Sequence, residues 1–574
     1  MKILSLHTDY IKFKPLKKAL KKINDLTDKK EKEVKEALVV LTAVEKGDEN
    51  VKLIVEKLVT EIQNIAKQVN VANIVLYPYA HLSSNLASPE IAQEVLIGAE
   101  KALNLIKGFR VTRAPFGYYK EFELKVKGHP LSELSREIKS ESKEEKKKSE
   151  KKIEDKYDAK QLLNEISKSK LDRSKLKDND HRILGMQMDL YSFSEVAPGM
   201  VFWHNNGLII RNELINFWRE LHKKAEYKEI KTPQILDKRL WQISGHWEKY
   251  KENIFLTKYE DKDFAVKPMN CPGGMLVYKN SPKSYKEFPL RVAELGEVHR
   301  QELSGVLGGL FRAIQFTQDD AHIFCTEKQI EQEIFGIIDL IDFVYKKFGF
   351  NYRVELSTRP EKRIGDEKIW DRAEDALQKV LEKRKIKFKI NKGDGAFYGP
   401  KIDFHLTDSL GREWQCATIQ LDMAMPERFE LEYTDSDNQR KRPVMLHRTV
   451  YGSLERFIGI LIEHFNGRLP TWLAPIQIRV LSFTDRNESY SKEIVKKIAE
   501  AIPNARIDAD FSQTTIQSKV KDAELMKVPY IITIGDKEEK SGDLAIRTRG
   551  KKEIEQMSLK DFISKLKSEI EERK

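Results

Sequence analysis

Hydrophobic and polar positions divide the chain into stretches of different character. Over residues 1–137, strand-like apolar runs at 2–6 and 73–77 alternate with amphipathic helical patterns at 51–69 and 89–103. Strands that alternate with helices favour an independent α/β layer domain. We therefore predict a first α/β domain over residues 1–137.

The pattern changes after residue 137. From residue 138 to residue 180 the chain is rich in Lys, Glu, Ser and Asp, with runs such as ESKEEKKK. Such a segment has too few apolar residues to bury a core. We predict a charged linker over residues 138–180.

The middle and the end of the chain show two further patterns. Short apolar runs separated by Gly, Pro and Asn turns fill residues 181–472, which is typical of an antiparallel sheet with flanking helices. A helix is expected at 208–225, before a strand that ends near Pro233. Strands and helices alternate again over 473–574, so we predict a second, mostly parallel α/β module there. The fold class is multidomain α+β.

Two arms with charged residues stand out in the middle region. Residues 291–302 place Arg300 and Glu302 two positions apart, and on a strand such residues point to the same face. A glycine-rich turn at 304–309 follows, and the return arm at 316–322 carries more polar residues. We predict a hairpin with a charged face.

Composition indicates the setting of the protein more than its fold. The 574 residues leave room for about three or four domains, and the net charge of +12 suits a polyanionic partner such as RNA. Cys271, Cys325 and Cys416 are too few and too scattered for a disulfide framework. No apolar run is long enough for a signal peptide or a membrane span. We expect a soluble cytoplasmic protein with no membrane partner.

The common nucleotide-binding loops are missing from the sequence. It has neither a Walker-type Gly-Lys-Ser/Thr loop nor a dinucleotide-binding Gly-x-Gly-x-x-Gly after an early strand. An arginine on a rigid strand can instead present a planar fork to a phosphate. A second arginine at a helix start behind a glycine can hold another phosphate of the same nucleotide.

Three segments in order carry a family resemblance. The helix–strand–Pro233 segment, the predicted hairpin and residues 451–457 (YGSLERF) resemble the three ordered motifs of class II aminoacyl-tRNA synthetases. Residues 267–273 (KPMNCPG), 319–325 (DDAHIFC) and 443–448 (PVMLHR) resemble the threonyl-tRNA synthetase branch of that family. The resemblance implies a class II antiparallel-sheet catalytic core, a homodimer, and L-threonine, ATP and tRNA(Thr) as partners.

The resemblance also implies roles in ATP binding. Arg300 would contact the α-phosphate, Glu302 would read the adenine amino group, and Arg312 would contact the distal phosphates. Phe316 and Arg456 would stack on either side of the adenine ring. Mg²⁺ would bridge the ATP phosphates and offset their developing charge.

For the amino acid, the resemblance implies one zinc ion (Zn²⁺) per subunit, held by Cys271, His322 and His447 with one open coordination position. The local spacing of these residues does not by itself indicate zinc. Threonine could fill the open position with its amino group and its hydroxyl. Valine has the amino group but lacks the hydroxyl. Asp320 would pair with the substrate ammonium. The other implied residues are Gln318, Gln420, Tyr398 and Lys401 in the pocket, and His246 in proton transfer, for which a packed histidine beside Trp247 is the alternative.

Serine poses a separate problem, because it keeps the hydroxyl and lacks only a methyl group, worth about 1–3 kcal/mol. Residues 77–85 (YPYAHLSSN), 116–120 (FGYYK) and 130–133 (PLSE) resemble the archaeal-type editing domain, whose fold is like that of D-aminoacyl-tRNA deacylases. This implies hydrolysis of mischarged seryl-tRNA(Thr). A plain RNA-binding domain of the same fold is the alternative. The implied editing residues are His81, Tyr119, Lys120 and Glu133, with Val44, Pro78 and Ala80 shaping the side-chain pocket.

The C-terminal module at 473–574 resembles the anticodon-binding domain of several class II synthetases. The chain departs from bacterial members at Gly274, where they usually have histidine, and at Ile314 or Gln315, where they have an additional arginine. Two alternatives stay open at this point. A synthetase for another class II amino acid would not need the Cys/His/His set, and a non-catalytic tRNA-binding regulatory relative would not need the intact ATP motifs.

Overall fold

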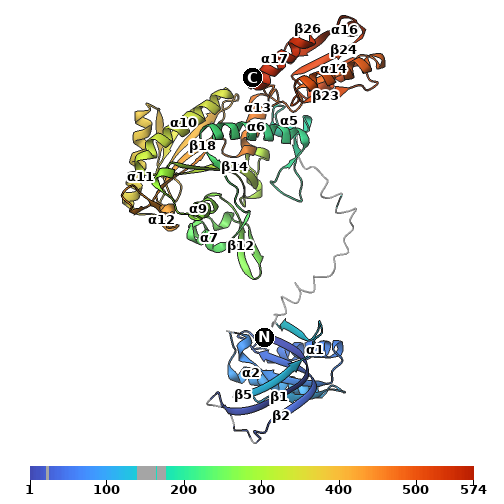
Figure 1. The fold of residues 1–574 in the computed structure, drawn as a ribbon, viewed down its shortest axis with the longest axis vertical. Coiled ribbons are helices and arrows are strands. Elements are labelled where there is room, and N and C mark those ends of the chain that lie inside the picture. The colour runs from blue at the N-terminus through green and yellow to red at the C-terminus, as the bar shows by residue number, and fades with distance from the viewer. Residues whose placement is uncertain (21–22, 24, 27, 84, 139–162, 164–175) are drawn as a thin grey trace. The chain divides into compact units, whose positions relative to one another are not determined.

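The computed structural model describes residues 1–574 except 21–22, 24, 27, 84, 139–162 and 164–175. Two compact units are present, Met1–Tyr157 and Asp158–Lys574 (Figure 1). Most of the predicted charged linker lies outside the described residues. No helix in the described part of the chain combines the length and the apolar character that crossing a membrane requires.

A six-stranded sheet forms the N-terminal unit. Strand β1 pairs antiparallel with β2, β5 and β6, whereas β3 pairs parallel with β2 and β4. The predicted strand at 2–6 was too short and β2 was missed, because both strands contain charged, exposed stretches that resemble loops. The strands are β1 (Lys2–Lys18), β2 (Lys32–Ala43), β3 (Asn73–Pro78), β4 (Arg110–Arg113), β5 (Tyr118–Val126) and β6 (Glu133–Glu137).

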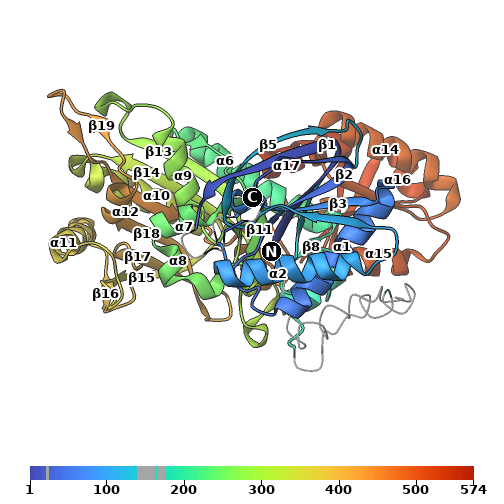
Figure 2. The same cartoon turned by 90° about the horizontal axis from the view of Figure 1, so that it is seen from below.

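Two helices, α1 (Val51–Gln68) and α2 (Pro89–Asn104), cover one face of this sheet (Figures 1 and 2). Leu58 of α1 is fully buried against Leu76 of β3 and its neighbours, as the predicted amphipathic pattern requires. The next residue along β3, Tyr77, points to the opposite face and belongs to a second cluster. The two faces of the sheet therefore have separate cores.

An eight-stranded sheet is the centre of the second unit. Only the β9–β13 and β15–β16 pairings are parallel, so the predicted antiparallel sheet with flanking helices is confirmed. In spatial order the strands are β16 (Phe388–Asn391), β15 (Asn351–Ser357), β17 (Lys401–Thr407), β18 (Glu413–Asp422), β21 (Val444–Thr449), β14 (Gln315–Cys325), β13 (Leu290–His299) and β9 (Lys228–Glu229).

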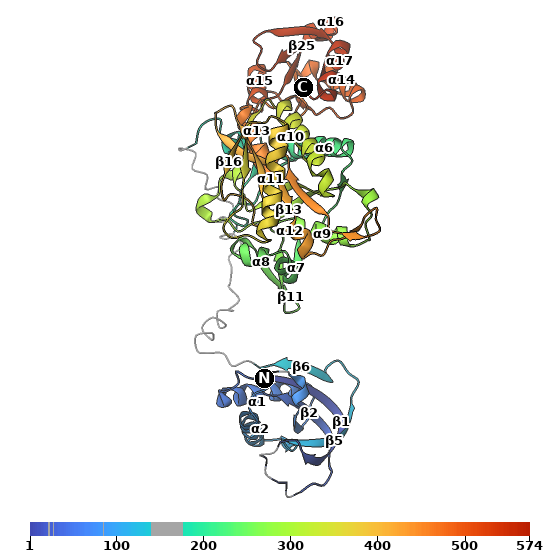
Figure 3. The same cartoon turned by 90° about the vertical axis from the view of Figure 1, so that its left-hand side faces the viewer.

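Helices pack against this sheet through one continuous apolar core. Figure 3 shows α10 beside α11 on the outside of the unit. The main helices are α6 (Asn205–Lys224), α10 (Ile330–Lys347), α11 (Glu367–Lys383) and α13 (Leu454–His464). The shorter elements are α5 (His181–Gln187), β7 (Tyr191–Ser192), β8 (Phe202–Trp203), β10 (Ile235–Asp237), α7 (Lys238–Ile243), α8 (His246–Lys249), β11 (Leu256–Tyr259), β12 (Lys262–Val266), α9 (Cys271–Lys279), α12 (Ala424–Arg428), β19 (Tyr433–Thr434) and β20 (Arg440–Lys441).

The predicted charged hairpin differs from the structure in one respect. Strands β13 and β14 do pair as two arms, with His299 opposite Gln315. Arg300 and Glu302 nevertheless lie beyond the end of β13, in a loop over residues 300–314 that contains two 3₁₀ turns. The N–H of Arg300 donates to the carbonyl of Ile314 at 2.9 Å and closes the base of this loop. The expectation that both charged residues sit on a strand was therefore wrong.

The C-terminal module has one sheet with helices on both faces (Figure 3). Two of its strand pairings are parallel and two are antiparallel, so the expectation of a mostly parallel sheet was wrong. The strands in spatial order are β23 (Ile507–Asp510), β22 (Ile478–Ser482), β24 (Tyr530–Ile534), β25 (Asp543–Thr548) and β26 (Ile554–Ser558). The helices are α14 (Glu488–Ala501) and α17 (Leu559–Glu571) in one core, α15 (Ile516–Leu525) in the other, and α16 (Asp536–Ser541).

A buried ion pair connects β13 to the segment that precedes α9. The side chains of Lys267 and Glu294 are each 1% exposed, and Lys267 Nζ lies 2.8 Å from Glu294 Oε1. Thr232 Oγ1 also donates to Glu294, at 2.9 Å. Removing one charge would leave the other buried without a partner.

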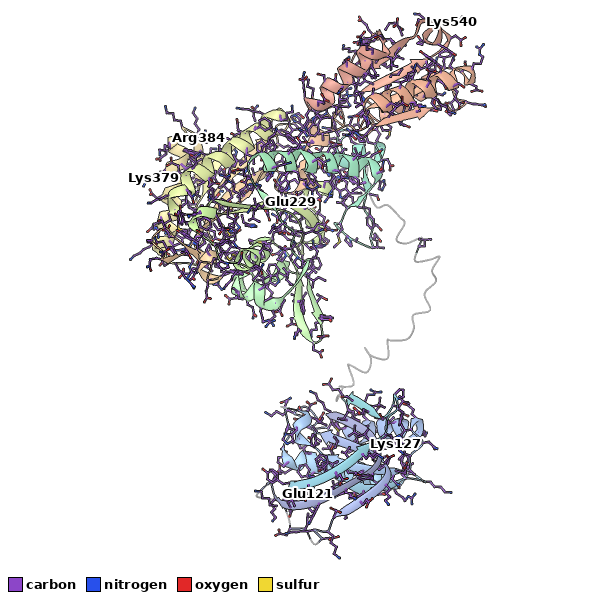
Figure 4. All side chains as sticks on the ribbon, in the orientation of Figure 1. Glu121, Lys127, Glu229, Lys379, Arg384 and Lys540 are labelled. Carbon is purple, nitrogen blue, oxygen red and sulfur yellow. The ribbon has the colours of Figure 1, made fainter. Side chains whose placement is uncertain are left out.

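We therefore expect Lys267→Met to lower the free energy of unfolding by about 3–5 kcal/mol. The double variant Lys267→Met/Glu294→Leu should recover most of this loss. Urea unfolding followed by tryptophan fluorescence measures both. Arg219→Met is the matched control, because it breaks the exposed pair with Glu229 (Figure 4) and should cost less than about 1 kcal/mol. Equal losses of unfolding free energy in Lys267→Met and Arg219→Met would contradict the prediction.

Candidate functional site

A cavity of about 520 Å³ opens over the eight-stranded sheet. Its wall contains side chains from β14, β18 and β21, from the loop at 300–314, and from the first residues of α9 and α13. It leaves out His246, predicted for proton transfer, and brings together all the residues predicted for ATP, amino-acid and metal binding. Those residues are Arg300, Glu302, Arg312, Phe316, Arg456, Gln318, Asp320, Tyr398, Lys401, Gln420, Cys271, His322 and His447.

Strand geometry explains how residues so far apart in the chain meet. Alternate residues of β14 point to one face, so Gln318, Asp320 and His322 all face the cavity. His447 of β21 lies directly opposite His322 on one side and Gln420 of β18 on the other. The polar residues of the return arm therefore form one row along β14. His447 of β21 and Gln420 of β18 continue this row across the sheet.

Within the cavity Arg300 is held by its surroundings. Its Nε donates to the carbonyl of Pro268 at 3.1 Å, and its Nη2 donates to Gln318 Oε1 at 3.2 Å. The guanidinium lies 5.1 Å from the ring centroid of Phe316 and 5.9 Å from that of Tyr250. Arg300 therefore lies over the ring of Phe316.

Two residues predicted to contact ATP contact each other. Arg312 donates from Nε and Nη2 to Glu302 Oε2, at 3.0 and 2.8 Å. Arg456 donates from Nε to the carbonyl of Phe311 at 2.9 Å. This hydrogen bond connects Arg456 to the loop that contains Arg312. A nucleotide that used both Glu302 and Arg312 would have to open their ion pair.

Asp320 is held by a residue that the sequence analysis missed. Asn270 Nδ2 donates to Asp320 Oδ2 at 2.7 Å. Burial raises the pKa of Asp320, and this hydrogen bond and Arg300 oppose the shift. Asn270 directly precedes Cys271, and only its place beside a predicted metal ligand could have indicated it. Nearby, Tyr398 donates its hydroxyl to Gln420 Oε1 at 2.7 Å.

The predicted metal ligands converge in the cavity. Cys271, His322 and His447 are buried, and one ligand atom from each lies within 4.8 Å of those of the other two. Burial lowers the pKa of His322, which keeps the imidazole neutral with a lone pair available for a metal. Burial raises the pKa of the Cys271 thiol, so a nearby cation would favour the thiolate. This donor set fits a zinc ion.

An outer carboxylate completes the group. Nε2 of His447 lies 2.9 Å from Oδ2 of the buried Asp422. With a proton on Nε2, His447 would donate to Asp422 and keep a lone pair on Nδ1, an arrangement common around zinc. Asp422 was not predicted, although it follows Gln420 by two residues on β18 and therefore shares its face.

The turn before α13 is also held by a carboxylate that was not predicted. Asp319 is fully buried and accepts hydrogen bonds from the backbone N–H groups of Val450, Tyr451 and Gly452, at 2.9 to 3.1 Å. Burial raises its pKa to about 7. Asp319 and Asp320 alternate on β14, so one supports the fold and the other faces the cavity.

Two further predicted residues, Lys401 and His246, differ in their surroundings. Lys401 lines the cavity and pairs with Asp403 at 2.8 Å; although burial opposes its charge, Asp403 and Asp394 raise its pKa. His246 is fully buried behind the cavity wall. Its Nδ1 lies within hydrogen-bond distance of Ser244 Oγ and its Nε2 of Met269 Sδ, both at 2.8 Å. Burial lowers the pKa of His246 to about 3. The structure does not bring it into the cavity.

The N-terminal unit brings together part of the predicted editing set. Lys120 Nζ donates to the carbonyls of Pro115 and Tyr118 at 3.0 and 3.1 Å, and lies 5.0 Å from the ring centroid of Tyr77. Burial lowers its pKa to about 8. The ring of Tyr79 lies 6.4 Å from that of Tyr77 and 5.5 Å from that of His81. An aromatic row therefore connects Lys120 to His81.

The other two predicted editing residues are placed differently. Tyr119 is 57% exposed, and Lys17 Nζ lies 5.7 Å from its ring centroid. Glu133 begins β6 opposite Leu6, whereas Lys120 lies opposite Pro15, further along β1. The strand pairings alone do not bring Glu133 to Lys120.

Three families match successive parts of the chain. Residues 1–138 match the family described as the Archaea-specific editing domain of threonyl-tRNA synthetase. Residues 255–465 match the tRNA synthetase class II core domain (G, H, P, S and T), and residues 477–569 match the anticodon binding domain.

Named relatives agree with these matches. A threonine–tRNA ligase of Carboxydothermus hydrogenoformans is 54% identical over 398 residues, which are 69% of this chain and 62% of the relative. A threonine–tRNA ligase of Natranaerobius thermophilus is 53% identical over 413 residues, 71% of this chain and 64% of the relative. The chain thus matches less than two thirds of the length of these relatives. The crystal structure of the RNA binding domain of threonyl-tRNA synthetase from Cryptosporidium parvum is similar with a TM-score of 0.66 and 40% identity, over 68% of this chain and 98% of that one.

Proposed function

Because this chain belongs to the threonyl-tRNA synthetase family, we propose that it attaches L-threonine to tRNA(Thr) at the expense of ATP. We further propose that its N-terminal unit hydrolyses mischarged seryl-tRNA(Thr). The observation that carries the proposal is one cavity that combines a buried Cys/His/His group with Asp320 and Arg300. A synthetase for another class II amino acid would have no use for that group.

The first step is an attack of the threonine carboxylate on the α-phosphate of ATP, which releases pyrophosphate. Arg300 is the residue that would hold the α-phosphate, because its guanidinium is already fixed by Pro268 and Gln318. Arg312 and Arg456 would contact the remaining phosphates and the adenine. In the second step a ribose hydroxyl of the terminal adenosine of tRNA takes the threonyl group, and AMP leaves.

The amino acid would lie in the same cavity. Asp320, held by Asn270, is the partner for the substrate ammonium, and Gln318 and Gln420 line the pocket. Cys271, His322 and His447 would hold a zinc ion, which would bind the amino group and hydroxyl of threonine as a Lewis acid. A site built for a hydroxyl rejects an analogue without it by up to about 10⁴–10⁵-fold. Valine is therefore excluded at this step, but serine is not.

The remaining partners follow from the same proposal. Mg²⁺ accompanies ATP, and the module at 473–574 binds the anticodon region of tRNA(Thr). A homodimer would form through residues 208–233, where Leu208 is 39% exposed. The cytoplasmic location and the domain boundaries at 137, 180 and 472 stay predictions.

The experiment that tests the proposal is ATP–pyrophosphate exchange by the full chain with each of several amino acids. We expect exchange with threonine, weaker exchange with serine and none with valine. Exchange that prefers proline or serine would instead indicate another class II synthetase. No exchange with any amino acid, in a zinc-loaded and folded protein, would favour a non-catalytic tRNA-binding relative.

Gly296 offers a further test of the amino-acid pocket. A Cβ atom at this position would lie 2.1 Å from Asn270 Oδ1, so Gly296→Ala should push Asn270 away from Asp320. Because a displacement of about 1 Å can cost about 10²-fold, we expect a 10- to 100-fold higher KM for threonine. The control is Gly305→Ala, which meets no atom within 4 Å. An unchanged KM for threonine in Gly296→Ala would contradict the role of Asn270.

A further inference from the structure

A buried histidine outside the cavity holds the loop that carries two of the proposed ATP contacts. His181 is 1% exposed and is the first residue of α5. Its Nε2 accepts a hydrogen bond from the N–H of Leu310 at 3.1 Å, and its ring lies 4.1 Å from that of Phe311. Leu310 and Phe311 belong to the loop segment 308–312, which ends at Arg312.

A metal site is the first alternative, because Asp180, His181 and Glu463 place their ligand atoms within 4.8 Å of one another. The hydrogen bonds argue against it. A backbone N–H can only donate, so Nε2 of His181 carries the lone pair and Nδ1 carries the proton. Nδ1 donates that proton to Glu463 Oε1 at 2.6 Å, and both ring nitrogens are occupied. Arg412 also donates to Glu463, at 2.6 Å.

The segment 308–312 packs closely between His181 and Trp414. Gly309 has a φ of +60°, and a Cβ atom there would lie 2.5 Å from His181 Nε2. On its other side the ring of Phe311 lies 4.3 Å from that of Trp414. The segment lies between β13 and β14 and has no strand ladder of its own, so side chains such as His181 set its position.

Two cavity residues depend on this position. The carbonyl of Phe311 accepts the hydrogen bond from Arg456 Nε, at 2.9 Å. Arg312 is the next residue in the chain and pairs with Glu302. A shift of the segment 308–312 would therefore move both Arg312 and Arg456. The contacts described for Asp320 and for Cys271, His322 and His447 do not involve this segment.

We propose that His181 is a positioning residue for ATP: it holds the segment 308–312 so that Arg312 and Arg456 are placed for the nucleotide. It acts through Leu310 and Phe311 and does not itself line the cavity. This inference rests on the proposed function, because ATP is the ligand that these two arginines are proposed to contact.

The test compares His181→Ala with His181→Gln in the full chain. We expect His181→Ala to raise the KM for ATP about tenfold, which corresponds to about 1.4 kcal/mol, and to leave the KM for threonine and the zinc content unchanged. A glutamine amide oxygen can accept from the Leu310 N–H where Nε2 did, so His181→Gln should recover most of the ATP affinity. His204→Ala is the control, since His204 also pairs with a carboxylate but does not contact the segment.

Hydrogen–deuterium exchange without nucleotide gives a second measurement. Peptides that cover residues 305–312 should exchange faster in His181→Ala than in the wild type, while His181→Gln should resemble the wild type. The inference would be overturned if His181→Ala changed the KM for ATP and the KM for threonine equally, or changed neither. It would also be overturned if His181→Gln had no higher ATP affinity than His181→Ala. If the wild type lacks threonine-dependent exchange, the proposed function fails instead. The hydrogen-exchange comparison still decides the role of His181 in that case.

Discussion

Replacing Cys271 by alanine is expected to remove the bound metal and threonine-dependent ATP–pyrophosphate exchange together. The variant leaves His322 and His447 as the remaining members of the ligand group, fewer than the three protein ligands of a catalytic zinc site. Changes to the outer partners of zinc ligands alone cost about 10–100-fold, so loss of a direct ligand should lower exchange by more than about 100-fold. The measurements are zinc per chain by mass spectrometry and the exchange rate at saturating ATP.

Cys325→Ala is the matched control for this variant. Cys325 is buried like Cys271, and it lies on β14, three residues beyond His322. It belongs to the apolar core and not to the ligand group. It should keep its zinc and its exchange activity, with only a modest loss of stability. Unchanged zinc content in Cys271→Ala would contradict the proposed ligand set.

Replacing Lys120 by methionine should have the second large effect, on hydrolysis of seryl-tRNA(Thr). The Lys120 ammonium is held by two carbonyls above the ring of Tyr77, at one end of the aromatic row that leads to His81. A positioned group of this kind contributes about 10²–10⁴-fold. We expect deacylation to fall by about that factor, while threonine-dependent exchange stays unchanged. The assay measures release of serine from purified seryl-tRNA(Thr) by the full chain.

Lys125→Met controls for the loss of a positive charge on the same strand. Lys125 lies further along β5, is exposed, and pairs with Asp9. It should hydrolyse seryl-tRNA(Thr) like the wild type. If Lys120→Met deacylates as fast as Lys125→Met, Lys120 has no part in editing.

Burial of Lys120 also makes the stability of the N-terminal unit depend on pH. Its pKa falls from 10.5 to about 8 in the folded unit because burial disfavours the charged form. Between these two values the unfolded chain binds the proton and the folded unit does not, so the free energy of unfolding rises with pH. Lys120→Met should lose this rise. The test is urea unfolding at pH 8 and pH 10, with hydrogen exchange in peptides from residues 1–138 as the readout. If the free energy of unfolding changed with pH equally in the wild type and in Lys120→Met, the prediction would be contradicted.

The apolar pattern predicted the helices and the antiparallel core better than the edges of the strands or the strand pairing of the C-terminal module. The helix α6 and the antiparallel core have strong periodic signals that tertiary packing does not override. Strand β2 starts with exposed charged residues, so its pattern resembles a loop until Ala37. Arg300 and Glu302 follow β13 with no change in polarity, so the sequence does not show that the strand ends at His299.

The residues of the site were predictable from motifs, but their mutual support was not. His322 and His447 are far apart in the sequence, and the register that places them opposite each other is a property of the folded sheet. Asn270 and Asp422 act on other side chains, so no local pattern indicates them. For His246 the structure supplies the buried surroundings of a packed histidine, which the sequence had left open as the alternative.

The most direct test of the central claim, that a metal at Cys271, His322 and His447 reads the amino acid, is zinc-edge X-ray absorption on the purified full chain with and without threonine. We predict one zinc per chain with one sulfur and two nitrogen ligands from the protein. Threonine should change the spectrum and valine should not. A protein that activates threonine with no sulfur bound to zinc, or with a spectrum that threonine leaves unchanged, would contradict it.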